Sequence, residues 1–166
     1  MHPNNAARQA IEGLVRIEET LSEIYHLLAD RFPAHRELWS RMAREETTHA
    51  KWIRDLSRRV EDGSVSLDED RFRIEGIQLF IEYAEEKFKE AKAERLPFLH
   101  ALDMALDLES SLLERKLYQV FKADSESMEQ ALEDMEYQIR EHTERIREAL
   151  AHEKGQACGA RKKDTP

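Results

Sequence analysis

The chain has 166 residues with 37% charged and 40% hydrophobic side chains, 5 glycines, 4 prolines and a formal net charge of -9. This length suits one domain that closes its own hydrophobic core. Acidic and basic residues are interspersed, which excludes the clustered positive surface that nucleic acids require. The few glycines and prolines favour long helices over the many turns of a β protein.

Three further features argue against export and against a membrane location. The single cysteine, Cys158, excludes a disulfide framework and a Cys-x-x-Cys metal site. Residues 1–8 lack the apolar core of a signal peptide. Since no apolar run approaches the length of a membrane span, we expect a cytoplasmic protein with no membrane partner.

Two long helices are predicted in the first part of the chain. The first covers about residues 5–30 and stops before Phe32-Pro33, because proline disrupts a continuing helix. The second covers about residues 34–61 and stops at Asp62-Gly63, a typical helix end. The short connection between them predicts an antiparallel hairpin.

A third helix is predicted over residues 68–93. Ser66 and Glu69 form the sequence pattern of a capping box ahead of it. One face of this helix is apolar and carries no chemical motif. It contains Ile74, Ile77, Ile81, Ala84 and Phe88.

The last part of the chain predicts a second hairpin. Pro97 suits a helix start, and the apolar pattern that follows runs to about residue 122. Asp124 and Ser125 are candidate caps for a final helix that reaches about residue 154. We expect a single domain over residues 1–155 and a flexible tail over residues 156–166.

These elements predict an all-α fold, with two hairpins joined by a long crossover connection that carries the helix at 68–93. A four-helix bundle with one long crossover has this organisation. In such a bundle, positions spaced alternately three and four apart form the buried stripe of each helix. In the helix after Pro97, the stripe contains Leu99, Leu102, Leu106, Glu109 and Leu113.

Ionisable residues interrupt all four predicted stripes. They are Glu18, Glu46, His49, Glu109 and His142. A buried carboxylate costs several kcal/mol unless it is paired or metal-bound. No lysine or arginine occupies the central levels of these stripes, so the sequence predicts a divalent metal as the counter-charge. Oxygen and imidazole ligands suit iron, manganese or zinc.

The motifs in the first half of the chain resemble those of the rubrerythrin-like branch of the ferritin-like superfamily. Glu18 lies seven residues before Tyr25, and the sequence Glu46-Thr47-Thr48-His49-Ala50 follows in the second helix. The resemblance covers roughly residues 8–150. It implies a non-haem diiron carboxylate protein built on a ferritin-like four-helix bundle.

The resemblance also assigns the second half of the site. Glu109 matches the ligand of the third bundle helix, and His142 matches the histidine of the fourth. Ile139 stands where the family has its second bridging glutamate, while Glu136 and Glu141 lie off the stripe. The resemblance therefore implies one or two iron ions held by Glu18, Glu46, His49, Glu109 and His142.

The functional expectation is an iron oxidoreductase that acts on peroxide, or on oxygen and ferrous iron. Members of the family often carry a rubredoxin module, and this chain has no paired Cys-x-x-Cys motif. The resemblance therefore implies a separate electron donor, and a homodimer is the expected assembly.

Two alternatives remain open at this point. One is a metal-binding or sequestration protein without turnover. The other is a structural module that interacts through the amphipathic helix around Ile74 to Phe88. Two residues near the site receive plain structural interpretations. Tyr25 is a core aromatic with a hydrogen-bonded hydroxyl, and Glu45 is a solvated charge that pairs at helical spacing.

Overall fold

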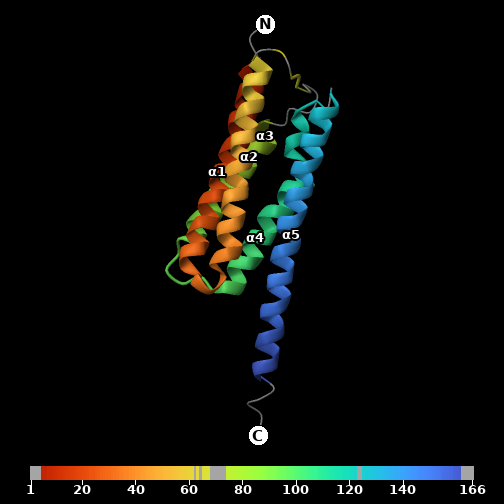
Figure 1. The fold of residues 1–166 in the computed structure, drawn as a ribbon. Coiled ribbons are helices and arrows are strands. Elements are labelled where there is room, and N and C mark those ends of the chain that lie inside the picture. The colour runs from red at the N-terminus through yellow and green to blue at the C-terminus, as the bar shows by residue number, and fades with distance from the viewer. Residues whose placement is uncertain (1–4, 62, 64, 68–73, 123–124, 162–166) are drawn as a thin grey trace.

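The computed structural model describes residues 5–61, 63, 65–67, 74–122 and 125–161. Within these ranges the chain is predominantly helical and has no strand beyond the isolated bridge between Leu67 and Phe121, which confirms the predicted all-α class. The elements are α1 (Asn5–Arg31), η1 (Pro33–His35), α2 (Arg36–Glu61), α3 (Ile74–Ala91), α4 (Phe98–Arg115), η3 (Leu117–Val120) and α5 (Glu126–Arg161). Figure 1 shows the long helices side by side along one axis.

The directions of the helices require a long crossover. α1 and α2 form an antiparallel hairpin, and the hydroxyl of Ser22 donates a hydrogen bond of 2.8 Å to the carbonyl of Ala43 between them. α4 and α5 form the second hairpin (Figure 1). Because α2 and α4 run in the same direction, the chain must return along the whole molecule between them, and α3 lies in this return.

The predicted bounds of the first two helices are confirmed to within a few residues, whereas those of the last two differ. The prediction that the helix after Pro97 runs to residue 122 is wrong. Lys116 adopts a left-handed backbone with φ 49° and ends α4, after which η3 turns toward α5. The last helix does not end near residue 154, since α5 continues through Gly155 to Arg161. The predicted tail is thus helical as far as Arg161.

The predicted caps can be compared only in part. Glu69 of the capping box and Asp124 lie outside the described residues. The hydroxyl of Ser125 accepts a hydrogen bond of 3.2 Å from the backbone N–H of Met128, which confirms Ser125 as a cap of α5. Of the helix predicted over residues 68–93, the structure describes Ile74–Ala91 as α3.

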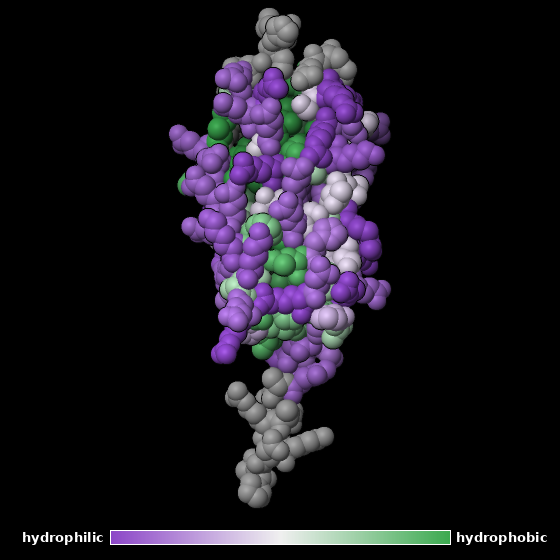
Figure 2. Space-filling model, turned by 90° about the vertical axis from the view of Figure 1, so that its left-hand side faces the viewer, coloured by the Kyte–Doolittle hydropathy of each residue, from purple (hydrophilic) through white to green (hydrophobic). Residues whose placement is uncertain are grey.

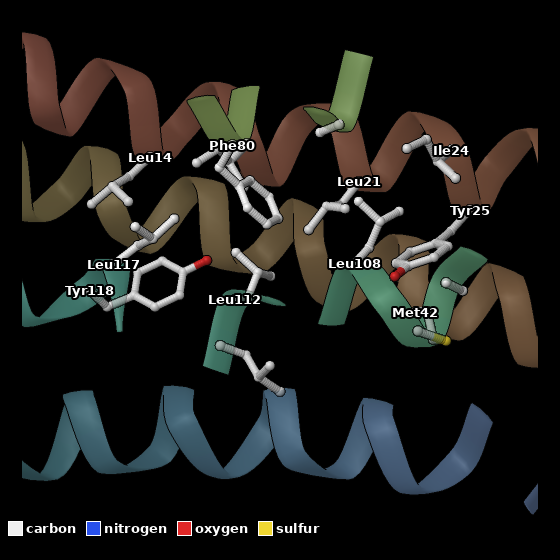
Figure 3. Packing of buried hydrophobic residues seen from close by; sticks show 14 of the residues in the cluster. Leu14, Leu21, Ile24, Tyr25, Met42, Phe80, Leu108, Leu112, Leu117 and Tyr118 are labelled. Atoms are coloured by element: carbon white, nitrogen blue, oxygen red, sulfur yellow. The ribbon is translucent and has the colours of Figure 1, made fainter. Parts of the chain in front are cut away.

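The buried face of α4 is shifted from the predicted stripe. Leu102 and Glu109 are buried as expected, but Leu99, Leu106 and Leu113 are only half-buried. The fully buried members of α4 are Ala101, Leu102, Met104, Ala105, Leu108, Glu109 and Leu112. Several of them line the core in Figure 3, where the side chains of Tyr25 and Tyr118 lie among leucines.

Polar side chains cover much of one face of the molecule (Figure 2). The face drawn in Figure 2 is mainly hydrophilic, with hydrophobic side chains visible in places between the charged ones. Leu79 and Tyr137 are large exposed hydrophobic residues, with 58% and 62% of their surface accessible. In the described part of the chain, no helix combines the length and the hydrophobicity needed to cross a membrane.

α3 packs against α1 at Gly13. A Cβ atom at Gly13 would lie 2.5 Å from Cγ2 of Ile77, which is too close for any real contact. The Ile77 side chain is β-branched and stiff at χ1, so it cannot easily rotate away. Glycine at this position therefore permits the close approach of the two helices.

We predict that Gly13→Ala lowers the free energy of unfolding by about 1–2 kcal/mol. Overpacking destabilises the folded state, and the higher helix propensity of alanine offsets part of that cost. Gly155→Ala is the matched control, because a Cβ there meets nothing within 4 Å. We expect it to leave stability unchanged or to raise it by up to about 1 kcal/mol. Urea denaturation of the two variants measures the difference, and equal effects would contradict the proposed packing.

Candidate metal centre

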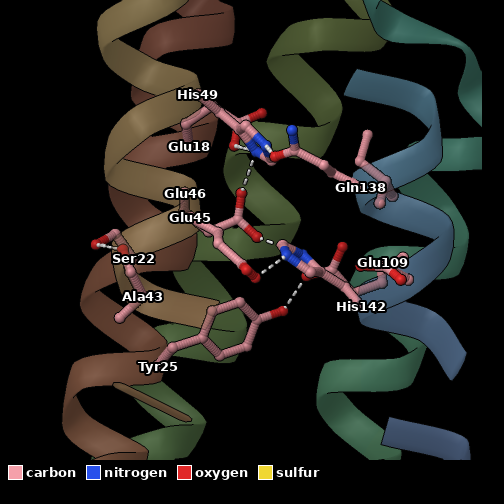
Figure 4. A network of polar contacts seen from close by, with 12 residues as sticks. Glu18, Ser22, Tyr25, Ala43, Glu45, Glu46, His49, Glu109, Gln138 and His142 are labelled. Atoms are coloured by element: carbon pink, nitrogen blue, oxygen red, sulfur yellow. Dashed lines mark hydrogen bonds and ion pairs between the residues drawn. The ribbon is translucent and has the colours of Figure 1, made fainter. Parts of the chain in front are cut away.

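The structure brings the five predicted ligands together in the middle of the molecule. Glu18 comes from α1, Glu46 and His49 from α2, Glu109 from α4 and His142 from α5 (Figure 4). Each residue has 4% or less of its surface exposed. The convergence of these side chains from four helices is the feature that the stripe pattern predicted.

Within the described ranges, two groups of these residues have the geometry to hold a metal ion. The first group is Glu18, Glu46 and His49, and the second is Glu46, Glu109 and His142. In each group the potential ligand atoms lie within 4.8 Å of one another. Glu46 belongs to both groups, so one carboxylate can contact two adjacent ions.

Both histidines direct the Nδ1 atom toward the carboxylates. Nδ1 of His49 lies 2.8 Å from Oε2 of Glu46 and 3.5 Å from Oε2 of Glu18. Nδ1 of His142 lies 2.9 Å from Oε1 of Glu46 and 3.5 Å from Oε1 of Glu109. The two halves are therefore arranged alike around Glu46.

Several polar atoms of this cluster lack a hydrogen-bond partner. Among the described residues, the buried side-chain atoms without one are Glu18 Oε2, Trp39 Nε1, Glu46 Oε1, Glu109 Oε2 and His142 Nδ1. His142 Nδ1 and Glu46 Oε1 approach each other without hydrogen-bond geometry. Buried polar atoms are rarely left unsatisfied, and here they gather on candidate ligands. A cation bound between them would satisfy them.

The two outer carboxylates each accept a hydrogen bond from a buried tyrosine. The hydroxyl of Tyr25 donates to Glu109, and the hydroxyl of Tyr118 donates to Glu18. The prediction of a core Tyr25 with a hydrogen-bonded hydroxyl is confirmed. Burial and the nearby carboxylate charges raise the pKa of both tyrosines well above 10, so both hydroxyls keep their protons at neutral pH.

The outward nitrogen of each histidine has a second partner. Nε2 of His49 lies 2.7 Å from Oε1 of Gln138, and Nε2 of His142 lies 2.9 Å from Oε2 of Glu45 (Figure 4). The interpretation of Glu45 as a solvated charge is therefore wrong in part. It pairs with Arg41 at helical spacing, but it also binds a histidine of the cluster.

Sequence reasoning missed three residues that support the cluster: Tyr118, Gln138 and Glu45. Tyr118 follows Glu109 by nine residues, whereas Tyr25 follows Glu18 by seven. A comparison of the two halves would have shown a glutamate followed by a tyrosine in each. The break at Lys116 hides this match, because it removes the regular helical spacing.

Residue 139, where the resemblance places a second bridging glutamate, is apolar in the structure. Ile139 lies one helical turn before His142 and has 2% of its surface exposed. Glu136 forms an ion pair with Arg140, and Glu141 forms one with Arg145. Neither glutamate therefore replaces Ile139, as the stripe pattern predicted.

The other histidines among the described residues lie away from the cluster. His26, His100 and His152 are exposed, and His35 is partly exposed and stacks on Phe98 with ring centroids 3.8 Å apart.

The two histidines balance the charge of the cluster when no metal is bound. Burial disfavours the charged imidazole, but hydrogen bonds and the charges of the glutamates outweigh it. They raise the pKa of His49 to about 12 and that of His142 to about 11. Burial also opposes ionisation of Glu46, but the two imidazolium rings hold its pKa well below 4.5. The sequence analysis looked for a counter-charge only among lysines and arginines. The histidines of the cluster can supply it themselves.

The pKa values of the two outer carboxyls, Glu18 and Glu109, shift in the opposite direction to that of Glu46. Burial, followed by the charge of Glu46, raises the pKa of Glu18 to about 8. The same two causes raise the pKa of Glu109 above 4.5. The metal-free cluster thus stores protons on its side chains, and a metal that bound there would have to displace them.

Comparison of the sequence with protein-family models, with curated proteins and with solved structures gives no match. The likeness to the rubrerythrin-like family therefore rests on the motifs, and the chemistry of the site rests on its geometry.

We predict that the metal-free protein becomes less stable as the pH rises. The folded-state pKa of Glu18 is about 8 against 4.5 ordinarily, so the folded state holds this proton more tightly. The resulting stabilisation is complete below pH 4.5 and is lost between about pH 4.5 and 8. The two histidines cause a further loss of stability. It begins near pH 6.5 and ends near their folded-state pKa values, about 12 for His49 and about 11 for His142.

Urea denaturation with a chelator present, at pH 5 and pH 8, measures this loss. Glu18→Gln removes one of the stored protons and should flatten the pH dependence. The control is Glu19→Gln, since Glu19 is an exposed neighbour that pairs with Arg54. Equal pH dependence in both variants would contradict the assignment of a stored proton to Glu18.

Proposed function

We propose that the protein is a ferritin-like four-helix-bundle metalloprotein that binds iron at two adjacent positions and carries out redox chemistry with peroxide or oxygen. Glu46 would be shared by both ions. Glu18 and His49 would complete one position, and Glu109 and His142 the other. Zinc or manganese would fit the same ligands.

One observation carries the proposal, namely the unsatisfied polar atoms on four separate candidate ligands. They are Glu18 Oε2, Glu46 Oε1, Glu109 Oε2 and His142 Nδ1. Unsatisfied buried polar groups each cost about 1–3 kcal/mol and require an explanation. A divalent ion in each triad accounts for all four atoms at once, whereas a purely structural cluster leaves them unexplained.

The donor set fits iron. It offers carboxylate oxygens and imidazole nitrogens without thiolates, a combination that suits non-haem iron. Bound iron would supply one-electron redox chemistry at this point. The chain itself would supply the positions of the donor atoms and a dry environment.

The surrounding side chains have distinct roles in this proposal. Tyr118 and Tyr25 orient the carboxylates of Glu18 and Glu109 by donating hydrogen bonds to them. Leu21, Leu108 and Leu112, which are buried with the tyrosines in the same core, exclude bulk water (Figure 3). Glu18 and Glu109 have raised pKa values, so they would hold protons while the site is metal-free and would release them when a cation binds.

Turnover requires a source of electrons. Reduction of a peroxide consumes two electrons, and the chain has no Cys-x-x-Cys motif that could hold a redox module. The proposal therefore includes a separate electron donor. It also includes a homodimer as the working assembly.

A metal-binding protein without turnover is the second candidate, and Ile139 favours it. This buried isoleucine stands where a second shared carboxylate would complete the pair of positions. Without a second shared carboxylate, the protein should bind the second ion more weakly. Redox-inactive zinc would then be a suitable occupant.

The test is elemental analysis of protein produced with added iron, followed by an absorption spectrum and the addition of peroxide. The proposal predicts one to two irons per chain and a spectrum that changes when peroxide is consumed. Bound metal that does not respond to peroxide would favour the second candidate. Protein that binds no metal would overturn both.

We also predict that Ile139→Glu raises the metal stoichiometry or affinity, because it restores a carboxylate one turn from His142. Ile139→Leu is the control, since it keeps an apolar side chain of similar volume. Calorimetric titration with Zn²⁺ compares the variants with the unmodified chain. Identical titrations for all three proteins would refute the assignment of residue 139 to the missing bridge.

A further inference from the structure

We propose that the two metal positions are unequal, and that the position formed by Glu46, Glu109 and His142 binds its ion first and more tightly. Glu45 is the positioning residue responsible, through its contact with the His142 ring. This inference rests on the proposed function and adds an order of occupation to it.

The contact between Glu45 and His142 fixes the ring for metal binding. Oε2 of Glu45 lies 2.9 Å from Nε2 of His142, so the carboxylate holds a proton on Nε2. Once Nδ1 releases its own proton, its lone pair faces Glu46 and Glu109, where the ion would lie. A carboxylate behind a metal-binding histidine orients the ring and strengthens it as a ligand.

Glu45 is itself held in place. Nη1 of Arg145 lies 2.6 Å from Oε2 of Glu45, and Nε of Arg41 lies 3.1 Å from its Oε1. The side chain of Glu45 is only 27% exposed. The carboxylate therefore keeps one orientation relative to His142.

His49 has a weaker support at the corresponding place. Its Nε2 contacts Oε1 of Gln138 at 2.7 Å, and Gln138 is an exposed residue of α5. An amide oxygen carries no net charge, so it polarises the imidazole less than a carboxylate does. Among the described residues, no arginine holds the amide of Gln138 in place as Arg41 and Arg145 hold Glu45.

The two positions offer the same kinds of donor atom. Each has one carboxylate of its own, the shared Glu46 and one Nδ1 nitrogen. Each outer carboxylate accepts a hydrogen bond from one buried tyrosine. The partner behind the histidine is therefore the difference to which we assign the order of binding.

Titration of the metal-free protein with Co²⁺, followed by absorption, and with Zn²⁺, followed by calorimetry, tests the inference. The unmodified chain should bind in two steps that differ by about tenfold or more in affinity. Glu45→Gln should weaken the tighter step by about 10–100-fold, the usual effect of removing such a support. Gln138→Glu should strengthen the weaker step, a gain that a merely structural role would not produce.

Glu141→Gln is the matched control. Glu141 binds the same Arg145 at 2.7 Å, yet it touches neither histidine among the contacts described. It should leave both steps unchanged. His142→Gln should remove the tighter step and His49→Gln the weaker one, which assigns the steps to the two positions.

The outcomes separate the two proposals. An unmodified chain that binds no Co²⁺ or Zn²⁺ would overturn the proposed function. Two equal steps, a tighter step that is lost in His49→Gln, or equal effects of Glu45→Gln and Glu141→Gln would overturn this inference alone. Since Gln138 is exposed, Gln138→Glu remains a fair test even if Glu45→Gln does not fold.

Discussion

The structure depends on the balance of charge at one buried point. Three carboxyl groups and two imidazoles meet where water is excluded, and such groups cannot remain there uncompensated. Without metal, the compensation comes from protons on His49 and His142, whose pKa values are raised to about 12 and 11. This arrangement leaves polar atoms of the cluster unsatisfied. A divalent ion would replace the protons and satisfy those atoms, which is why we propose a metal-binding role.

The helices position the buried cluster. α1, α2, α4 and α5 carry their cluster residues near mid-length, so the charges lie away from the helix ends. Tyr25 and Tyr118 close the cluster on the core side with hydrogen bonds. On the opposite side, Gln138 and Glu45 connect α2 and α5 through the histidines. These polar contacts place the cluster next to the seam between α2 and α5, where Gln138 reaches solvent.

Much of this arrangement could be predicted from the sequence, because helical periodicity is a local property. The spacing of Glu18 and Glu109 within apolar stripes is enough to predict that both carboxylates lie on the buried face of a helix. The α4 stripe was misplaced because its apolar residues are dense enough to fit more than one face. The partial error on Glu45 has another origin. Its side chain reaches His142 only because α5 lies beside α2, and one helix's spacing contains no information about its neighbour.

X-ray anomalous scattering from crystals grown with Zn²⁺ or Fe²⁺ would test the central claim most directly. The account predicts a metal peak bounded by Glu46, Glu109 and His142, and a second, equal or weaker peak bounded by Glu18, Glu46 and His49. A cluster that contains no peak, in crystals whose other surfaces bind the same ion, would contradict it. The buried charges would then be a structural network balanced by protons alone.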